Sequence, residues 1–126
     1  MVLLVEDDDA VRALLGRALR ANGFEVVAAA SGEEALDLEH DRQVDLLLSD
    51  VLLPNQNGFE VANQIQARSP HIPIVFMSGY YDQALAEAAH LDISSTILQK
   101  PFAMADLLAH LRAACAASKP VDDAAH

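Results

Sequence analysis

The sequence predicts an α/β fold, in which a doubly wound, five-stranded parallel sheet carries helices on both faces. Short apolar segments alternate with helical patterns five times along the 126 residues. Such alternation is typical of parallel strands joined by right-handed crossover helices. The strand segments are apolar almost throughout, which indicates burial on both sides of the sheet. With a hydrophobic content of 52%, a chain of this length is expected to form the core of one domain.

Five apolar runs mark the predicted strands. They lie at residues 2–5, 24–28, 44–50, 73–77 and 96–99. Each run is short and is bounded by turn-forming or charged residues, as expected for buried strands. Asn22 and Gly23 form a turn before the second run, and a polar loop from Pro54 to Gly58 follows the third.

Apolar residues at helical spacing mark five helices. Their stripes lie within residues 11–19, 32–40, 59–67, 82–91 and 107–115. Leu14 belongs to the first stripe and is expected to face the core. The second helix is expected to begin with a capping box formed by Ser31 and Glu34. Asp8 and Asp9 are expected to begin the first helix, where negative charge meets the helix dipole.

The folded domain is expected to occupy residues 1–117, and the polar residues 118–126 are expected to form a tail or linker. A single cysteine, Cys115, excludes an internal disulfide and a thiolate metal cluster within this chain. The five histidines lack the spacing of metal ligands, so we expect them to be surface residues.

The net charge of −11 narrows the classes of partner. Nucleic-acid binding depends on Lys and Arg neutralising phosphates. Because only eight basic residues are scattered along the chain, no direct contact with nucleic acid is expected. No apolar run reaches the length of a membrane span, and no secretory signal is visible. We therefore expect a cytoplasmic domain without membrane contact, whose acidic surface suits a metal ion or a basic protein face.

Polar side chains follow four of the five predicted strands. Glu6 and Asp7 end the first, Asp50 the third, Ser78 the fourth and Lys100 the fifth. Because the carboxyl ends of parallel strands meet at one edge of the sheet, where open α/β folds bind ligands, we expect these side chains to converge there.

This set of residues favours phosphoryl chemistry at a metal site. Clustered carboxylates suit Mg²⁺ (or Mn²⁺), which is held by few protein ligands together with water and substrate oxygens. A carboxylate beside the metal can attack phosphorus and form an aspartyl phosphate. A lysine and a hydroxyl can then bind the phosphoryl oxygens, because phosphoryl transfer depends mainly on positioning and charge neutralisation. Taken alone, Ser78 has a simpler explanation as the cap of the following helix.

Four motifs in this order resemble the response-regulator receiver domain of two-component signalling. They are VLLVEDD, LLLSDVLLPNQNG, IVFMSG and ILQKPF. The resemblance covers residues 2 to about 117, so that residues 1–117 would be the receiver domain. It implies a flavodoxin-like sheet with the strand order 2-1-3-4-5.

The resemblance also implies a role for each residue at the predicted edge. Asp50 matches the phospho-acceptor, and Lys100 and Ser78 match the residues that contact the phosphoryl group. Glu6 and Asp7 match the acidic pair that holds Mg²⁺, to which the main-chain carbonyl of Leu52 also binds.

Five further positions match or depart from the family pattern. Pro54 and Gly58 match the loop after the acceptor, and Pro101 matches a proline whose preceding bond is often cis. Tyr80 occupies a position that tunes the loss of the phosphoryl group. Ile97 stands where the family often has an aromatic switch residue, so an aromatic in-out switch is not expected here.

The resemblance implies a phospho-switch that receives its phosphoryl group from a histidine kinase or a histidine phosphotransfer domain. Self-phosphorylation and self-dephosphorylation are expected, with no turnover of an outside substrate. The stretches SGYYDQ and ILQKPF are closer to receivers of hybrid histidine kinases. Two alternatives stay open: a haloacid-dehalogenase-type phosphatase, which would need an acid where Leu52 stands, and a phosphorylation-independent pseudo-receiver, which Ile97 alone favours.

Overall fold

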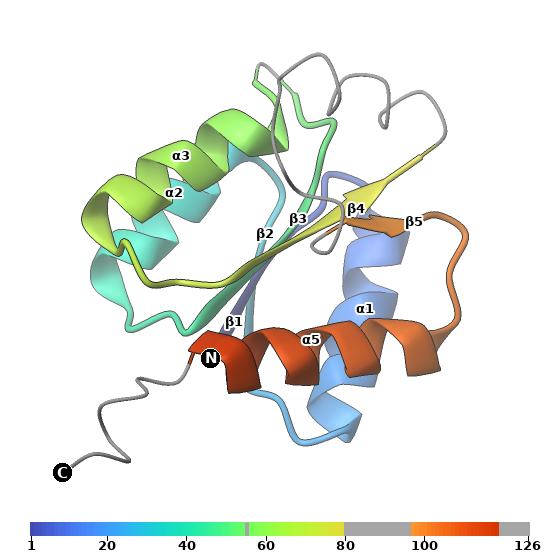
Figure 1. Cartoon of the computed structure of the whole chain (residues 1–126). Helices are drawn as coiled ribbons and strands as arrows, with labels where there is room; N and C mark the ends of the chain where they lie inside the picture. The colour runs from blue at the N-terminus through green and yellow to red at the C-terminus, as the bar shows by residue number, and fades with distance from the viewer. Residues whose placement is uncertain (55, 80–96, 119–126) are drawn as a thin grey trace, which may run out of the picture.

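A single parallel sheet in the order β2-β1-β3-β4-β5 forms the centre of the protein (Figure 1). The computed structural model describes residues 1–54, 56–79 and 97–118. The strands are β1 (Val2–Val5), β2 (Val26–Ala29), β3 (Leu46–Asp50), β4 (Ile74–Ser78) and β5 (Ile97–Gln99). All four strand pairs are parallel. The predicted fold class and strand order are therefore confirmed.

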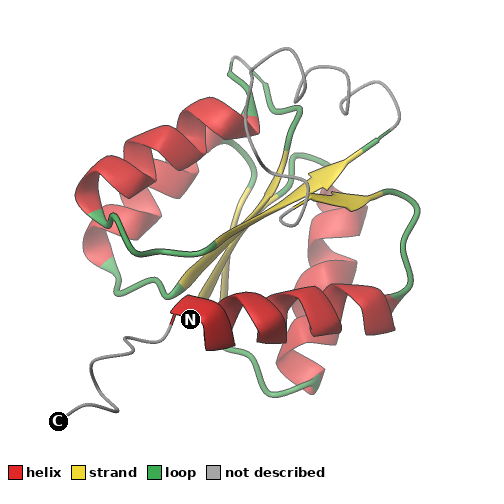
Figure 2. Ribbon diagram, in the orientation of Figure 1, coloured by secondary structure: helices red, strands yellow, loops and turns green. Residues whose placement is uncertain are grey.

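Four described helices cover the two faces of the sheet (Figure 2). They are α1 (Asp9–Ala21), α2 (Gly32–Asp41), α3 (Gly58–Arg68) and α5 (Met104–Ser118). The first and last pack on one face, whereas α2 and α3 pack on the other. None of these helices has the length and apolar character needed to cross a membrane. The helix predicted at 82–91 lies outside the described residues.

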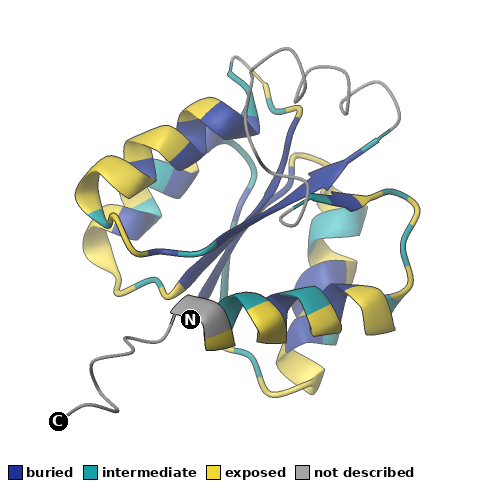
Figure 3. Ribbon diagram, viewed as in Figure 1, coloured by how far each residue is buried: buried dark blue, intermediate teal, exposed yellow. Residues whose placement is uncertain are grey.

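The sheet separates two hydrophobic clusters, because successive strand side chains point to opposite faces. Leu3 and Leu47 pack beneath α2 and α3, whereas their neighbours Leu4 and Leu48 pack beneath α1 and α5. The strands β1, β3 and β4 are buried along their length, the edge strands β2 and β5 are only partly buried, and the outer helix surfaces are exposed (Figure 3). This two-sided burial explains why the strand sequences are apolar rather than alternating.

Two strands begin two residues later than the sequence predicts. The expected starts were residues 24 and 44, whereas β2 begins at Val26 and β3 at Leu46. Both pair with Val2, the first residue of β1, so earlier residues have no partner strand on that side. Phe24 is apolar because it packs against the α1–α5 cluster from a turn.

The prediction that Leu14 faces the core is wrong. Its side chain is 62% exposed, whereas Leu15 and Leu19 of the same helix are buried. Only one side of the helix packs against the sheet, and the apolar stripe in the sequence is wider than the surface that the sheet covers. Asp8 and Asp9 begin the helix as expected: the Asp8 side chain accepts a hydrogen bond from the Val11 amide, and Asp9 lies in the first turn.

Helix caps differ in part from the prediction. Ser31 accepts a hydrogen bond from the Glu34 amide as expected, but the Glu34 carboxylate accepts from Ala30 rather than from Ser31. A complete capping box occurs instead at α3, where Asn57 and Glu60 each accept a hydrogen bond from the other's backbone amide. We predict from the sequence only a polar loop up to Gly58, although the pattern Asn-x-x-Glu at residues 57–60 is compatible with this cap.

Candidate functional site at the carboxyl edge of the sheet

Two acids follow directly after the central strand β1. The Glu6 amide still donates to the Ala29 carbonyl of β2, at 3.1 Å, so the backbone of Glu6 extends the sheet by one bond. Its side chain is buried, with 2% of its residue surface exposed, whereas Asp7 is exposed. The strand end therefore places one carboxylate inside the molecule and the next at its surface.

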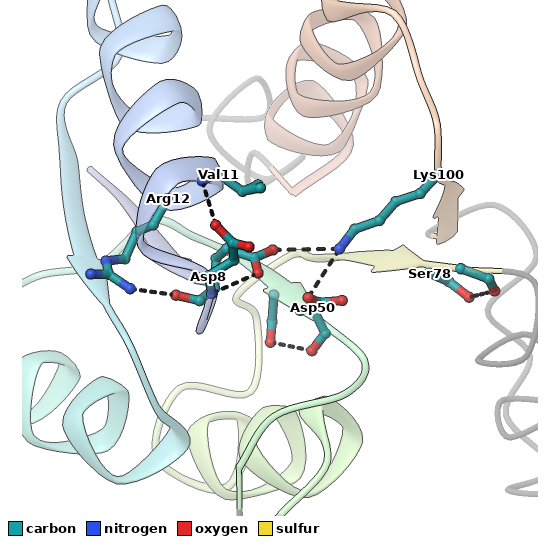
Figure 4. A network of polar contacts seen from close by, with 9 residues as sticks. Asp8, Val11, Arg12, Asp50, Ser78 and Lys100 are labelled. Atoms are coloured by element: carbon teal, nitrogen blue, oxygen red, sulfur yellow. Dashed lines mark hydrogen bonds and ion pairs between the residues drawn. The ribbon is translucent and has the colours of Figure 1, made fainter.

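Asp50 and Lys100 meet these acids from β3 and from the end of β5. The Lys100 Nζ atom lies 3.0 Å from an Asp50 carboxylate oxygen and 3.4 Å from Glu6 Oε2 (Figure 4). Ligand oxygens of Glu6, Asp7 and Asp50 all lie within 4.8 Å of one another. The convergence predicted from the strand ends is therefore present for three carboxylates and one ammonium group.

Burial raises the pKa of Glu6 from 4.5 to about 7. The Asp8 amide, which donates to Glu6 Oε1 at 3.1 Å, opposes this rise, and the charge of Asp50 adds to it. Lys100 lowers the pKa of Glu6 by a smaller amount. The ammonium group of Lys100, 3.4 Å away, therefore does not fully compensate the cost of burying the charged Glu6 carboxylate.

Lys100 is held in its protonated form. Burial alone would lower the pKa of its ammonium group, but the hydrogen bond and charge of Asp50, together with Glu6, raise that pKa above its usual value. A cation that stays charged at every physiological pH acts as an electrostatic partner and not as a base.

The donor set fits a hard divalent cation. All three converging side chains offer carboxylate oxygens, and Asp7 is exposed to the solvent that would complete the coordination of Mg²⁺. No other group of three such ligands gathers elsewhere in the described part of the chain. The three histidines within the described residues do not join this group: His40 and His71 are exposed, and His110 contacts the Asp106 carbonyl of its own helix.

The backbone of Asp50 is enclosed by the loop that leads into α3. The Ser49 hydroxyl donates to the Asp50 carbonyl at 2.9 Å, and the Gly58 amide donates to the Val51 carbonyl at 2.7 Å. A Cβ atom on Gly58 would lie 2.2 Å from the Asp50 carbonyl oxygen, which is an impossible contact. Gly58 was predicted as part of this loop, and the close approach explains why the position needs glycine.

The β1–α1 loop is held by charged side chains instead. Arg12 Nη1 donates to the Glu6 carbonyl at 2.9 Å, and its Nη2 pairs with Asp9. The Asp8 amide binds the Glu6 side chain. The sequence carries no signal of the contact between Arg12 and the Glu6 carbonyl, because a spacing of six residues across the end of a strand matches no local motif.

Ser78 and Leu52 stand near the site, but their predicted contacts stay predictions. Ser78 ends β4 and is fully buried, and its hydroxyl donates to the Gly79 carbonyl at 3.0 Å (Figure 4). Leu52 forms an isolated bridge with Asn57, and its side chain is half-exposed.

The remaining predicted positions flank the site. The Lys100–Pro101 bond is cis, as the resemblance implies, and Pro54 is exposed in the β3–α3 loop. Ile97 pairs with Phe76 in the sheet register and packs against the α2–α3 cluster. Tyr80 lies outside the described residues.

The chain matches the family model of the response regulator receiver domain over residues 2–112. The response regulator MprA of Mycobacterium avium is 40% identical over 124 residues, which are 98% of this chain and 54% of that protein. The sensor kinase CckA of Brucella abortus is 41% identical over 108 residues, which are 84% of this chain and 11% of that protein. This chain thus spans about half the length of MprA.

Solved structures agree with these relatives. The receiver domain of the hybrid histidine kinase CckA superposes with a TM-score of 0.75 and 33% identity, covering 90% of this chain and 97% of that one. A receiver domain protein from Clostridium thermocellum gives a TM-score of 0.84 at 24% identity, covering 94% and 95% of the two chains, which supports the fold.

Proposed function

The chain belongs to the response regulator receiver domain family, and from this membership we propose that it is a phospho-acceptor of two-component signalling. Asp50 accepts a phosphoryl group from a phosphohistidine of a histidine kinase or a histidine phosphotransfer domain. The observation that carries this proposal is the position of the Asp50 carboxylate, 3.0 Å from the Lys100 ammonium and within 4.8 Å of the acidic pair Glu6 and Asp7.

The transfer is a displacement at phosphorus. A carboxylate oxygen of Asp50 attacks, the new O–P bond forms, and the P–N bond to the donor imidazole breaks with its electron pair remaining on nitrogen. Mg²⁺ or Mn²⁺, when held by Glu6, Asp7, Asp50 and the Leu52 carbonyl, would neutralise phosphoryl oxygens during this step. The only other covalent step is the return reaction, in which water attacks phosphorus and the O–P bond to Asp50 breaks, so that inorganic phosphate leaves and the carboxylate is restored.

Lys100 and Ser78 complete the environment of the phosphoryl group. Lys100 already pairs with Asp50, and its raised pKa keeps the ammonium charged for a phosphoryl oxygen. The Ser78 hydroxyl donates to a backbone carbonyl one residue away. Because hydroxyl groups rotate at little cost, this donor can turn to a phosphoryl oxygen when one is present.

The added charge is then the signal. The Asp50 carboxylate loses its own charge on forming the acyl phosphate and gains a phosphoryl group that carries nearly two, so phosphorylation adds about one negative charge beside the carboxylates of Glu6 and Asp7. The charge draws Lys100 and Ser78 from two neighbouring strands, so β4, β5 and the segments beside them form the surface whose partners change. We propose this switching as the whole output, without turnover of an outside substrate.

Labelling by a small phosphodonor tests the proposal. The purified chain is incubated with acetyl phosphate and Mg²⁺, and the labelled peptide is identified by mass spectrometry. We expect one phosphoryl group on the peptide that contains Asp50, and none after chelation of the metal or in Asp50→Asn.

The matched control is Asp37→Asn, which removes an exposed aspartate of α2 and should label like the wild type. Label that persists in Asp50→Asn would move the acceptor elsewhere. A wild-type chain that binds Mg²⁺ but takes no label would support the pseudo-receiver instead.

A further inference from the structure

Arg12 connects helix α1 to the peptide group between the two acids of the site. Its Nη1 atom donates to the Glu6 carbonyl at 2.9 Å (Figure 4). Its Nη2 atom pairs with Asp9 in the first turn of the same helix. The side chain is 22% exposed, so most of its surface lies against the protein. The planar guanidinium group is therefore held by two partners on different segments, the Glu6 carbonyl at the end of β1 and the Asp9 carboxylate in α1.

The orientation of the Glu6 carbonyl bears directly on Asp7. The peptide group is planar, so its carbonyl oxygen, the Asp7 nitrogen and the Asp7 Cα lie in one plane. The remaining groups of Glu6 are also held, by Ala29 at the amide and by Asp8 and Lys100 at the carboxylate.

Asp7 itself is the exposed acid of the cluster. The Asp7 carboxylate lies beside those of Glu6 and Asp50 when the backbone of Asp7 holds its side chain in the right orientation. The hydrogen bond from Arg12 to the Glu6 carbonyl, made from helix α1, fixes that backbone orientation.

We propose that Arg12 is a positioning residue of the metal site: it fixes the peptide between Glu6 and Asp7 so that the Asp7 carboxylate faces those of Glu6 and Asp50. The inference rests on the proposed function, because it takes the acidic cluster as the place where Mg²⁺ binds. Arg12 itself touches neither the metal nor the phosphoryl group.

Two effects of Arg12 on a bound cation have opposite signs, which makes the proposal testable. As a positive charge near the cluster, Arg12 repels Mg²⁺, so removing the charge should strengthen binding. As a brace for the backbone, it orients a ligand, and loss of such outer contacts typically weakens metal binding about tenfold or more. The direction of the change therefore identifies the dominant effect.

Arg12→Lys separates geometry from charge. The lysine keeps the positive charge but offers a single ammonium group, which cannot hold the Glu6 carbonyl and Asp9 through a planar fork. We expect its dissociation constant for Mg²⁺, measured by isothermal titration calorimetry at 25 °C, to rise about tenfold. Arg12→Ala should also bind Mg²⁺ more weakly than the wild type, despite the removed charge.

Arg17→Lys and Arg17→Ala are the matched controls, because Arg17 is an exposed arginine of the same helix. Both should stay within about twofold of the wild-type dissociation constant. Urea unfolding of every variant confirms that the titrated protein is folded, so a general loss of stability does not register as a change in affinity. Amide NMR shifts of residues 6–8 should move in Arg12→Lys without added metal.

Unchanged Mg²⁺ affinity in Arg12→Lys, or a higher Mg²⁺ affinity in Arg12→Ala, would overturn the proposed positioning role of Arg12. Only its electrostatic effect would then remain. These outcomes differ from failure of the proposed function. In that case the wild type itself would bind no Mg²⁺, or would bind it without phosphorylation of Asp50.

Discussion

The two loops that carry the site's carboxylates are held by different kinds of contact. The β3–α3 loop fixes Asp50 by close approach of backbone to backbone: the amide of Gly58 binds the Val51 carbonyl, and no Cβ fits at that position. The Ser49 hydroxyl adds a buried hydrogen bond to the Asp50 carbonyl. Contacts of this kind do not depend on pH or salt.

The β1–α1 loop depends on charge. Its acids are held by Arg12 and Lys100 and by the amide of Asp8. Such contacts change with protonation and with ions in solution. The comparison indicates a division of roles: the proposed nucleophile Asp50 has a sterically fixed backbone, and the proposed metal ligands of the β1–α1 loop are held by charges to which a bound cation would add.

Gly58→Ala should produce the largest loss of stability, because it disturbs the close backbone packing of the β3–α3 loop. The new Cβ would lie 2.2 Å from the Asp50 carbonyl oxygen and 3.1 Å from Ser49 Oγ. Backbone atoms of a buried strand cannot move aside without disturbing the sheet. We expect the free energy of unfolding, measured in urea, to fall by about 3 kcal/mol.

Gly23→Ala is the control for this substitution. Gly23 has a positive φ of 90°, but a Cβ there would meet nothing within 4 Å. Its cost should come from backbone strain alone, about 1 kcal/mol. Equal losses in the two variants would contradict the close approach to Asp50 as the reason for glycine at position 58.

Glu6→Gln tests the charged loop and should have the second largest effect. The pKa of Glu6 is about 7 in the folded protein and 4.5 as the reference for the unfolded chain. Between these values the unfolded chain loses the proton while the folded one keeps it, so the metal-free protein loses stability as pH rises from 4.5 towards 7. Glutamine removes this loss.

Urea unfolding in a chelator at several pH values measures the effect. The stability of Glu6→Gln relative to the wild type should rise by about 2 kcal/mol between pH 5 and pH 8, because the Asp8 amide and Lys100 partly offset the cost of the buried charge. Adding Mg²⁺ should reverse the order of stability at pH 8. Glu25→Gln, at an exposed glutamate, should show no such pH dependence. A constant difference across this range would contradict the raised pKa.

Much of the architecture could be predicted from the sequence, because hydrophobic patterning reports burial. The runs at β1 and β4 are apolar since both faces of the sheet are covered, and polar residues at strand ends mark the edge where Glu6, Asp50 and Lys100 meet. The strand order came from the family resemblance rather than from the pattern.

Details that depend on neighbours distant in the fold could not be predicted. A helical stripe states that one side is apolar but not how much of it the sheet covers, so Leu14 was placed in the core although it is exposed. Strand starts depend on where the partner strand begins, which displaced β2 and β3. The contact of Arg12 with the Glu6 carbonyl requires knowing how α1 leaves the sheet.

The helix caps of the two loops give the smallest effect and the finest test of the comparison. Asp8 caps α1 through the Val11 amide at 3.0 Å, and Asn57 caps α3 through the Glu60 amide at 2.9 Å. Alanine at either position should lower the free energy of unfolding by about 1 kcal/mol, measured in urea.

Exchanging the two cap types separates hydrogen bonding from charge. Asp8→Asn and Asn57→Asp both keep a side-chain oxygen for the capped amide, so each should change stability by less than about 0.5 kcal/mol in the absence of metal. Asp8→Asn should nevertheless weaken Mg²⁺ binding modestly at low salt, because one negative charge leaves the β1–α1 loop. Asn57→Asp serves as the counterpart on the steric loop. If Asp8→Asn were as destabilising as Asp8→Ala, the charge of Asp8 rather than its hydrogen bond would hold the start of α1, and electrostatic control would extend from the acids of the site into the helix.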